Sequence, residues 1–219
     1  MDAAIKPKGG AAFAWADRLR KLKTVWVSDA QGSVGVLHEA IKSLVPGAIA
    51  AGPAFTVACY PGSIITVHKA LAEARAGDVL MVAGDADDRG ALLGELMALA
   101  CNVLGLAGAV IDGAVRDAPG LREQGFPVYA RFVTPRVGTN RRVGSTQVPV
   151  SCGGVVVHPG DWVLADDDGV VVIPLGDVEA VVTRAEAAES KEQQIADRIK
   201  AGELTIDILA TRDIVYPKT

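Results

Sequence analysis

Three short apolar stretches decide the fold: Val79-Leu80-Met81-Val82, Ala107-Gly108-Ala109-Val110-Ile111 and Pro127-Val128-Tyr129-Ala130. The first is a continuous apolar run, which is the pattern of a strand buried on both of its faces. Helical patterns separate the three stretches, over residues 91–104 and again over 120–125. This β-α-β-α-β alternation between residues 78 and 130 predicts parallel strands joined by crossover helices.

The sequence on either side of this unit predicts a mixed sheet. Before it, residues 51–60 are rich in β-forming side chains and residues 64–74 read as a helix. After residue 135, tight-turn sequences separate short β segments at 148–150, 154–157, 162–165 and 170–173, which predicts antiparallel hairpins. We therefore expect an α/β fold, with one compact domain over residues 1–219 that mixes parallel and antiparallel strands.

Cap and turn residues set the expected limits of the other segments. Ser28 and Asp29 are N-cap candidates for a short helix over residues 30–35, and Asp177 is one for a long helix over residues 177–200. Residues 84–90, GDADDRG, are expected to form a loop. Residues 1–10 are polar, with Pro7 and two glycines, and are expected to be flexible.

The composition excludes several classes of protein. Of 219 residues, 50% are hydrophobic and 22% are charged, with a formal net charge of −4, which argues against disorder and against nucleic-acid binding through a broad basic face. Three widely separated cysteines show neither metal-ligand nor disulfide-framework spacing, which favours a reducing cytoplasm. We expect neither a signal peptide nor a membrane span.

A single carboxylate stands out in the apolar segment 90–104, GALLGELMALACNVL. Glu95 is its only charged side chain, and an unpaired buried carboxylate is costly, so this residue is exposed, paired or functional. If the helix starts near Gly94, the free amides of Glu95, Leu96 and Met97 would form an anion site. The alternative is a solvent-exposed glutamate that the helix dipole favours.

A second candidate follows the apolar stretch that ends at Ile111. Ligands of parallel α/β sheets bind beyond the carboxyl ends of strands, and the sequence there is Asp112-Gly113-Ala114-Val115-Arg116-Asp117. Arg116 offers a bidentate carboxylate clamp, and Asp117 offers a hard oxygen ligand for a divalent cation. The alternative is a surface loop in which Asp117 caps the next helix.

A third candidate lies in the expected C-terminal helix. Glu192 falls in the middle of an apolar stripe at helical spacing: Val178, Val181, Val182, Ala185, Ala188, Ile195 and Ile199. This position either has a function or belongs to a partner-facing surface that tolerates polar residues.

Other signals in the sequence are weaker. The three histidines, His38, His68 and His158, have no ligand spacing, which argues against zinc, and the sequence 166–169, DDDG, reads as a hairpin turn.

Two of these segments together resemble a known family. Gly94-Glu95-Leu96-Met97-Ala98 is followed by residues 108–117, GAVIDGAVRD, with twenty residues between Glu95 and Arg116-Asp117. An acidic residue, twenty residues and then Arg-Asp is the signature of the RraA-like family. That family includes the class II 4-hydroxy-4-methyl-2-oxoglutarate / 4-carboxy-4-hydroxy-2-oxoadipate aldolases and the ribonuclease E inhibitors. Further similar segments extend over nearly the whole chain, from about Val27 to Leu204.

The resemblance implies an architecture and an assembly. The family fold is a domain of α/β/β layers of the swivelling-domain type, assembled as a homotrimer or homohexamer, with active sites between neighbouring subunits. A glutamate from the neighbour's C-terminal helix completes each site. Counting back from the matching block 201–204, AGEL, places that glutamate at Glu192, the residue that interrupts the apolar stripe.

The resemblance also implies a role for each residue of the signature. Asp117 would bind Mg²⁺ or Mn²⁺, mostly alongside waters, and Arg116 would hold the pyruvyl end of a 2-oxo acid. The amides of Leu96 and Met97, which follow Gly94, would receive the substrate carboxylate. Glu95 would hold a metal-bound water.

These roles imply retro-aldol cleavage of a 4-hydroxy-2-oxo acid and decarboxylation of oxaloacetate through the same pyruvate enolate. Many aldolases of the family carry Asp where this chain has Glu95, and the extra methylene would move the water. The group that recognises the substrate's 4-substituent is expected in the loop 134–146, with Arg136, Arg141 and Arg142. The alternative function is a non-enzymatic regulator like the ribonuclease E inhibitors.

Overall fold

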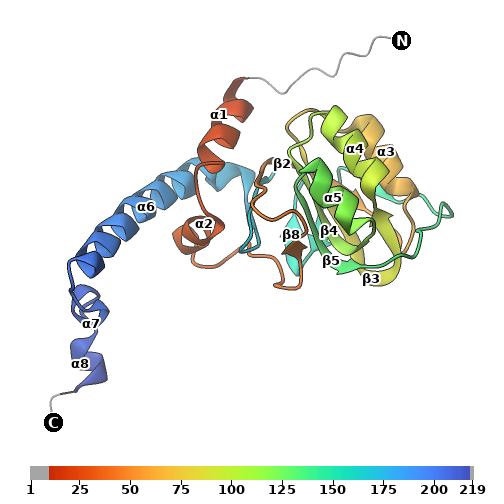
Figure 1. The fold of residues 1–219 in the computed structure, drawn as a ribbon. Helices are drawn as coiled ribbons and strands as arrows, with labels where there is room; N and C mark the ends of the chain where they lie inside the picture. Colours follow the sequence, from red (N-terminus) through yellow and green to blue (C-terminus); the bar gives the residue numbers. More distant parts are fainter. Residues whose placement is uncertain (1–9, 218–219) are drawn as a thin grey trace.

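The computed structural model describes residues 10–217 and places helices on both sides of one large sheet (Figure 1). The helices are α1 (Gly10–Leu19), α2 (Thr24–Ala30), α3 (Ile65–Glu73), α4 (Glu95–Val103), α5 (Ala118–Gln124), α6 (Val178–Lys200), α7 (Thr205–Ile208) and α8 (Arg212–Val215). The strands are β1 (Lys42–Ser43), β2 (Ala50–Ala58), β3 (Val79–Leu93), β4 (Gly108–Val115), β5 (Val128–Val133), β6 (Ser145–Thr146), β7 (Val150–Cys152), β8 (Val155–Val157), β9 (Trp162–Ala165) and β10 (Val170–Ile173).

The main sheet has the strand order β1-β5-β4-β3-β2-β9-β10, with β6 paired to β2. Strands β2, β3, β4 and β5 are parallel neighbours, and the predicted crossover helices α4 and α5 connect the last three. Strands β9 and β10 form an antiparallel hairpin that extends the sheet beyond β2, and β7 and β8 form a separate hairpin. The predicted mixture of parallel and antiparallel strands is therefore confirmed.

The first part of β3, residues 79–84, is buried on both faces, as its continuous apolar sequence predicts. Leu80 and Val82 pack on the side of α3, α4 and α5, whereas Val79 and Met81 pack on the side of the β7–β8 hairpin. These two cores give the expected α/β/β layering. A third core joins α1, α2 and α6 to β9 and β10, and Figure 1 shows these helices on the side away from α4.

The predicted loop over residues 84–90 is wrong. These residues belong to β3, which continues beside β4 with shifts in register, so that Asp87 lies opposite Gly113 and Ala91 opposite Ala114. Asp85 and Ala86 adopt left-handed conformations with φ of 55° and 52°, which give the strand its irregular course. Sequence composition favoured a loop because polar and glycine residues are uncommon in a regular strand, but a bulged strand accommodates them.

Two predicted helix starts are also wrong. The helix expected from Ala91 starts at Glu95, because Ala91 and Leu93 pair with β4. A helix was expected over residues 30–35, but the observed helix, α2, covers Thr24–Ala30 and so ends where the predicted one would begin. Its start is fixed at Thr24, whose N–H and hydroxyl both donate to the carboxylate of Asp166, at 2.8 and 2.7 Å.

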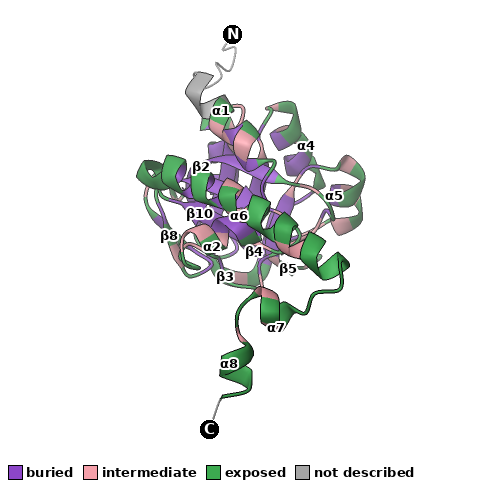
Figure 2. Cartoon of the chain, turned by 90° about the vertical axis from the view of Figure 1, so that its left-hand side faces the viewer, coloured by how far each residue is buried: buried purple, intermediate pink, exposed green. Residues whose placement is uncertain are grey.

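The C-terminal helix follows Asp177, as predicted, although the Asp177 side chain makes no capping hydrogen bond. One face of its first two turns is buried through Val178, Val181, Val182 and Ala185, and the rest of the helix is mostly exposed (Figure 2). The predicted flexible segment 1–10 lies outside the described residues except for Gly10. Within residues 10–217, no helix is both long enough and apolar enough to cross a bilayer.

Candidate active site

The candidate site forms where two neighbouring parallel strands end. Strand β3 ends at Leu93 and β4 at Val115, and the N–H of Arg116 donates to the carbonyl of Leu93 at 3.0 Å. Gly94 lies in the gap between them. A Cβ atom at this residue would lie 2.7 Å from Asp117 Oδ2 and 3.0 Å from Arg116 Cγ. Glycine is therefore required here for close approach, and it brings the start of α4 against the Arg-Asp pair.

Asp117 does not act as a helix cap. It occupies the N-cap position of α5, but its side chain makes no capping hydrogen bond, and its backbone is left-handed with φ of 60°. Oδ2 instead lies 3.3 Å from Arg116 Nε and accepts a hydrogen bond from the Glu95 N–H at 3.3 Å. The carboxylate is 40% exposed, so it is open to a ligand. Strained backbone at an exposed carboxylate is typical of functional sites.

The start of α4 supplies one free amide. Among the described residues the N–H of Leu96 has no hydrogen-bond acceptor, whereas the N–H of Met97 donates to the carbonyl of Gly94 at 3.1 Å. Glu95 is exposed in the first turn, as the alternative interpretation expected. Its carboxylate nevertheless lies against α5, where a side chain at Gly120 would collide with it. Glu95, Arg116 and Asp117 therefore come together at one edge of the sheet.

A cavity of about 370 Å³ between the end of β2 and the middle of β3 contains none of the predicted site residues. Gly94, Leu96, Met97, Arg116 and Asp117 line a different cavity, of about 230 Å³, whose lining includes neither Glu95 nor Glu192. The residues around it are Ile64, His68, Ala91, Leu93, Gly94, Leu96, Met97, Arg116, Asp117, Val137, Gly138 and Asn140. Two polar side chains, His68 and Asn140, were not predicted to be there. The loop 134–146 does reach the site, but the cavity lining includes none of its arginines.

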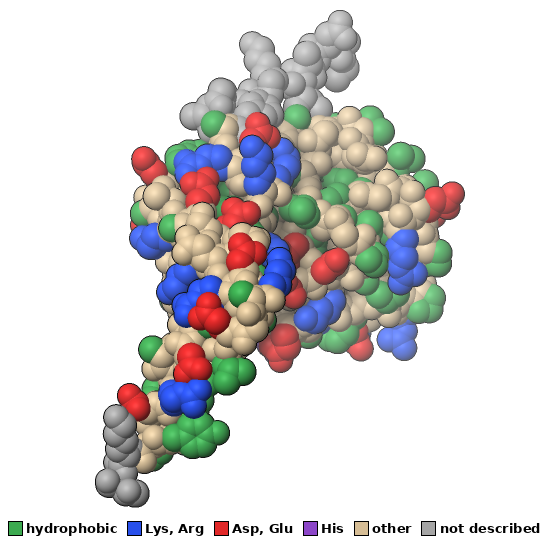
Figure 3. Space-filling view, turned by 60° about the vertical axis from the view of Figure 1, so that its left-hand side comes forward, with side chains coloured by type: hydrophobic (Ala, Val, Ile, Leu, Met, Phe, Trp, Pro, Cys, Tyr) green, Lys and Arg blue, Asp and Glu red, His purple; other side chains and the backbone are tan. Residues whose placement is uncertain are grey.

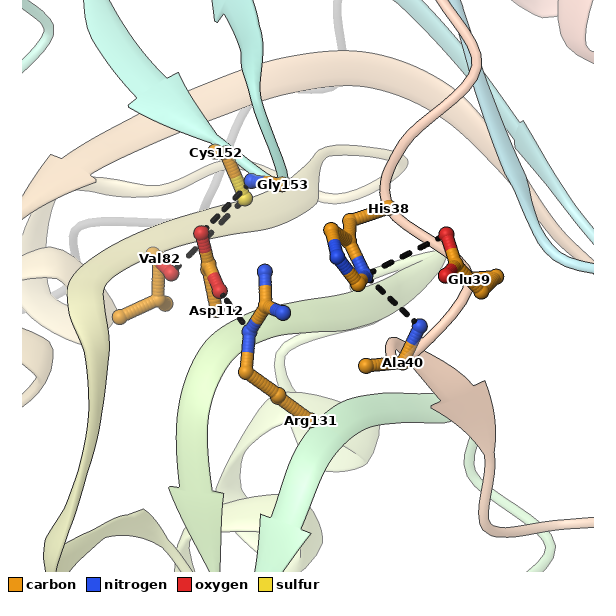
Figure 4. Close-up of polar contacts among 8 residues, drawn as sticks. All are labelled: His38, Glu39, Ala40, Val82, Asp112, Arg131, Cys152 and Gly153. Atoms are coloured by element: carbon orange, nitrogen blue, oxygen red, sulfur yellow. Dashed lines mark hydrogen bonds and ion pairs between the residues drawn. The ribbon is translucent and has the colours of Figure 1, made fainter.

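Asp112 belongs to the same sequence motif as Arg116 and Asp117 but has a structural role (Figure 4). Its carboxylate is 9% exposed and accepts hydrogen bonds from Arg131 Nε and from the N–H of Gly153, both at 2.6 Å. This ion pair connects β4 to β5 and to the β7–β8 hairpin. Burial, with a contribution from Asp112, raises the pKa of the neighbouring Cys152 thiol to about 12.

Glu192 lies apart from the other predicted site residues of its own chain. One carboxylate oxygen accepts a hydrogen bond from the indole N–H of Trp26, and the other lies 3.9 Å from Lys23 Nζ. Both contacts are on the side of α6 that faces α2. The role of Glu192 in a neighbouring subunit's site therefore stays a prediction.

The residues of the cavity fit a magnesium-type ion rather than a closed metal cage. Within residues 10–217, no group of three or more His, Cys, Asp or Glu side chains could hold a metal. Mg²⁺ is commonly held by one or two carboxylates together with water and substrate oxygens. Asp117 supplies one exposed carboxylate of this kind, and it lines the cavity of about 230 Å³.

Comparisons with known proteins show what this chain is similar to. Residues 24–172 match the model of the RraA-like family, Aldolase/RraA. A protein of Halalkalibacterium halodurans, provisionally named 4-hydroxy-4-methyl-2-oxoglutarate aldolase, is 36% identical over 84% of this chain and 90% of its own length. A Burkholderia multivorans protein with the same provisional name is 39% identical over 65% of this chain and 87% of its own length.

Two solved structures share the fold. An uncharacterised protein from Pseudomonas syringae pv. tomato has a TM-score of 0.83 at 28% identity, covering 96% of this chain and 98% of its own. Streptomyces coelicolor RraAS2, described as an unusual member of the RNase ES inhibitor RraA family, has a TM-score of 0.78 at 29% identity. The match to RraAS2 covers 88% of this chain and 100% of that one.

Proposed function

Since this chain belongs to the RraA-like family, Aldolase/RraA, we propose that it is a divalent-metal-dependent class II pyruvate aldolase. It cleaves 4-hydroxy-2-oxo acids such as 4-hydroxy-4-methyl-2-oxoglutarate to pyruvate and a second 2-oxo acid, and it decarboxylates oxaloacetate. The observation that carries this proposal is the close approach of α4 to Arg116 and Asp117 across Gly94. This close approach places Leu96, Arg116 and Asp117 around one cavity of about 230 Å³, which a small anion could enter.

The groups around Gly94 match the pyruvyl end of such a substrate. The free N–H of Leu96, at the start of a nine-residue helix, is suited to a carboxylate. The Arg116 guanidinium lies within the same cavity and suits the 2-oxo oxygen, where negative charge develops as the carbon–carbon bond breaks. Asp117 would hold Mg²⁺ or Mn²⁺, and a bound divalent cation supplies further stabilisation of that charge.

Cleavage also needs a group that takes the proton of the 4-hydroxyl. Glu95 is exposed, and its N–H donates to Asp117 while its carboxylate lies against α5 outside the cavity lining, so we propose that it accepts this proton through a water. Glu192 of a second copy is the other carboxylate we propose for this step. Its own chain keeps it on α6, outside the cavity, so it can reach only a neighbouring molecule's site.

Exposed apolar surface supports an assembly with shared sites. Beside the cavity, α4 exposes Leu96, Leu99 and Val103, which are spaced along one face of the helix. The C-terminal arm, residues 199–217, projects from the body and carries Ile199, Leu204, Leu209, Ile214, Val215 and Tyr216 exposed (Figures 1 and 3). Surfaces of this kind mark protein interfaces, and we propose a homotrimer or homohexamer. The three buried, free cysteines suit the cytoplasm, where we propose the protein acts.

A pyruvate-release assay tests the activity. Oxaloacetate and 4-hydroxy-4-methyl-2-oxoglutarate are supplied separately, with Mg²⁺ and with EDTA, to the wild type and to Arg116→Ala. We expect release only with the metal, and a loss of about 10²–10³-fold in Arg116→Ala because a donor to the developing charge is removed. Arg122→Ala, an exposed arginine on α5 outside the cavity, is the matched control. No pyruvate from either substrate would favour the regulatory alternative.

Subunit mixing tests the shared site. Asp117→Ala and Glu192→Ala proteins, each expected to be nearly inactive, are mixed under conditions that allow subunits to exchange. If the site joins Asp117 of one copy with Glu192 of another, about a quarter of the sites in a random mixture are intact and activity returns. Exchange of subunits with no recovery of activity would show that Glu192 does not complete the site.

A further inference from the structure

The cavity has a second wall that the proposed cleavage chemistry does not use. Helix α3 contributes His68, with Ile64 directly before the helix, and the segment after β5 contributes Val137, Gly138 and Asn140. This wall lies in the same cavity as Arg116 and Asp117 but comes from different elements. It therefore contacts whatever part of a substrate extends beyond the pyruvyl end.

The segment that forms this wall is held in place by backbone hydrogen bonds. The N–H of Ile64 donates to the carbonyl of Thr139 at 2.9 Å, and the N–H of Ala91 donates to the carbonyl of Arg136 at 3.0 Å. A side chain at Gly138 would collide with the carbonyl of Ala91, so the segment packs directly on the strand end. The wall is thus preformed, which lowers the entropic cost of binding.

Two hydrogen-bond donors of this wall are unused. Within residues 10–217, neither the imidazole of His68 nor the side-chain amide of Asn140 takes part in a hydrogen bond or ion pair. Both side chains carry N–H groups that suit a carboxylate. The remaining side chains of the wall, Ile64 and Val137, are apolar.

The proposed substrate, 4-hydroxy-4-methyl-2-oxoglutarate, has a second carboxylate on the far side of the bond that breaks. Arg116 and Asp117 are committed to its pyruvyl end, and the arginines of the loop 134–146 lie outside the cavity lining. Arg142 instead stacks on the ring of Tyr60, at 4.0 Å. We propose that His68 and Asn140 bind this second carboxylate and so select 4-hydroxy-2-oxo diacids. This inference rests on the proposed aldolase function.

The apolar part of the wall sets a further preference. Ile64 and Val137 suit a methyl or hydrogen substituent at C4, whereas a carboxymethyl group would bring a third carboxylate to apolar side chains. The diacid is therefore preferred over the tricarboxylate 4-carboxy-4-hydroxy-2-oxoadipate as well as over monoacids.

The test compares the diacid with a monoacid that lacks the second carboxylate. Values of kcat/KM are measured for 4-hydroxy-4-methyl-2-oxoglutarate and for 4-hydroxy-2-oxopentanoate in the wild type, His68→Ala and Asn140→Ala. We expect each substitution to lower the diacid-to-monoacid ratio about tenfold or more, the effect of losing a hydrogen bond to a charged group. His68→Gln keeps an N–H donor and is expected to restore part of the ratio. Lys69→Ala and Arg141→Ala, neighbours outside the cavity lining, are expected to leave it unchanged.

A second readout separates this inference from the proposed function. Exchange of the methyl protons of pyruvate with D₂O, followed by NMR, reports enolate formation without any second carboxylate. If the wild type exchanges and cleaves but both variants keep the diacid-to-monoacid ratio within twofold, the carboxylate subsite is refuted and the aldolase stands. If the wild type neither exchanges nor cleaves, both proposals fail.

Discussion

Replacing Gly94 by alanine tests the geometry of the site with a single methyl group. Gly94 has φ of −144° and ψ of −173°, an extended conformation that alanine adopts freely, so backbone strain does not contribute. The added Cβ would lie 2.7 Å from Asp117 Oδ2, and that oxygen would have to retreat by roughly 0.7 Å to reach an ordinary contact. A displacement near 1 Å at a reacting centre costs about 100-fold in rate. We expect kcat/KM for pyruvate release to fall by about 10–100-fold.

The matched control is Gly176→Ala, where a Cβ meets nothing within 4 Å. Both variants are assayed for pyruvate release and for unfolding in urea, which separates a loss of activity from a loss of fold. The explanation requires that Gly94→Ala stays folded, loses activity and needs more Mg²⁺, whereas Gly176→Ala behaves as the wild type. A folded Gly94→Ala protein with activity within twofold of the wild type would show that the close approach at Gly94 does not position Asp117 for the reaction.

Two predictions concern the rest of the molecule. Asp112→Ala leaves the guanidinium of Arg131, which is only 11% exposed, without its partner. We therefore expect a loss of about 3–5 kcal/mol in the free energy of unfolding measured in urea. A loss below about 1 kcal/mol would contradict this structural role of Asp112. Burial raises the pKa of all three thiols to about 12, so at pH 8 they are protonated and should not react with Ellman's reagent until the protein unfolds. Rapid labelling of a folded protein at Cys59, Cys101 or Cys152 would contradict the structure.

The part of the site that could be predicted consists of residues that belong to short sequence motifs at the ends of secondary-structure elements. Gly94-Glu95 precedes a helix and Arg116-Asp117 follows a buried strand, so parallel strand order brings both to the same edge of the sheet. The parallel strands could be predicted from the apolar runs, because a strand that is buried on both faces has a continuous apolar sequence.

The rest depends on contacts between residues far apart in the sequence. His68 and Asn140 reach the cavity because the loop hydrogen-bonds to the start of α3, which no local pattern reveals. The irregular strand at residues 84–90 has the composition of a loop, and only its pairing with β4 makes it a strand. Asp112 looks like a site residue in the motif, but Arg131 and Gly153 bind it in the interior.

The proposed function is tested most directly by the dependence of pyruvate release on Mg²⁺. Release from 4-hydroxy-4-methyl-2-oxoglutarate is titrated with Mg²⁺ after removal of metal by EDTA, for the wild type and for Asp117→Asn. We expect wild-type activity to disappear with EDTA and to return with Mg²⁺, and Asp117→Asn to remain nearly inactive or to require much more metal. Activity that survives EDTA, or an unchanged Mg²⁺ requirement in Asp117→Asn, would contradict the assignment of Asp117 as the metal ligand of an aldolase.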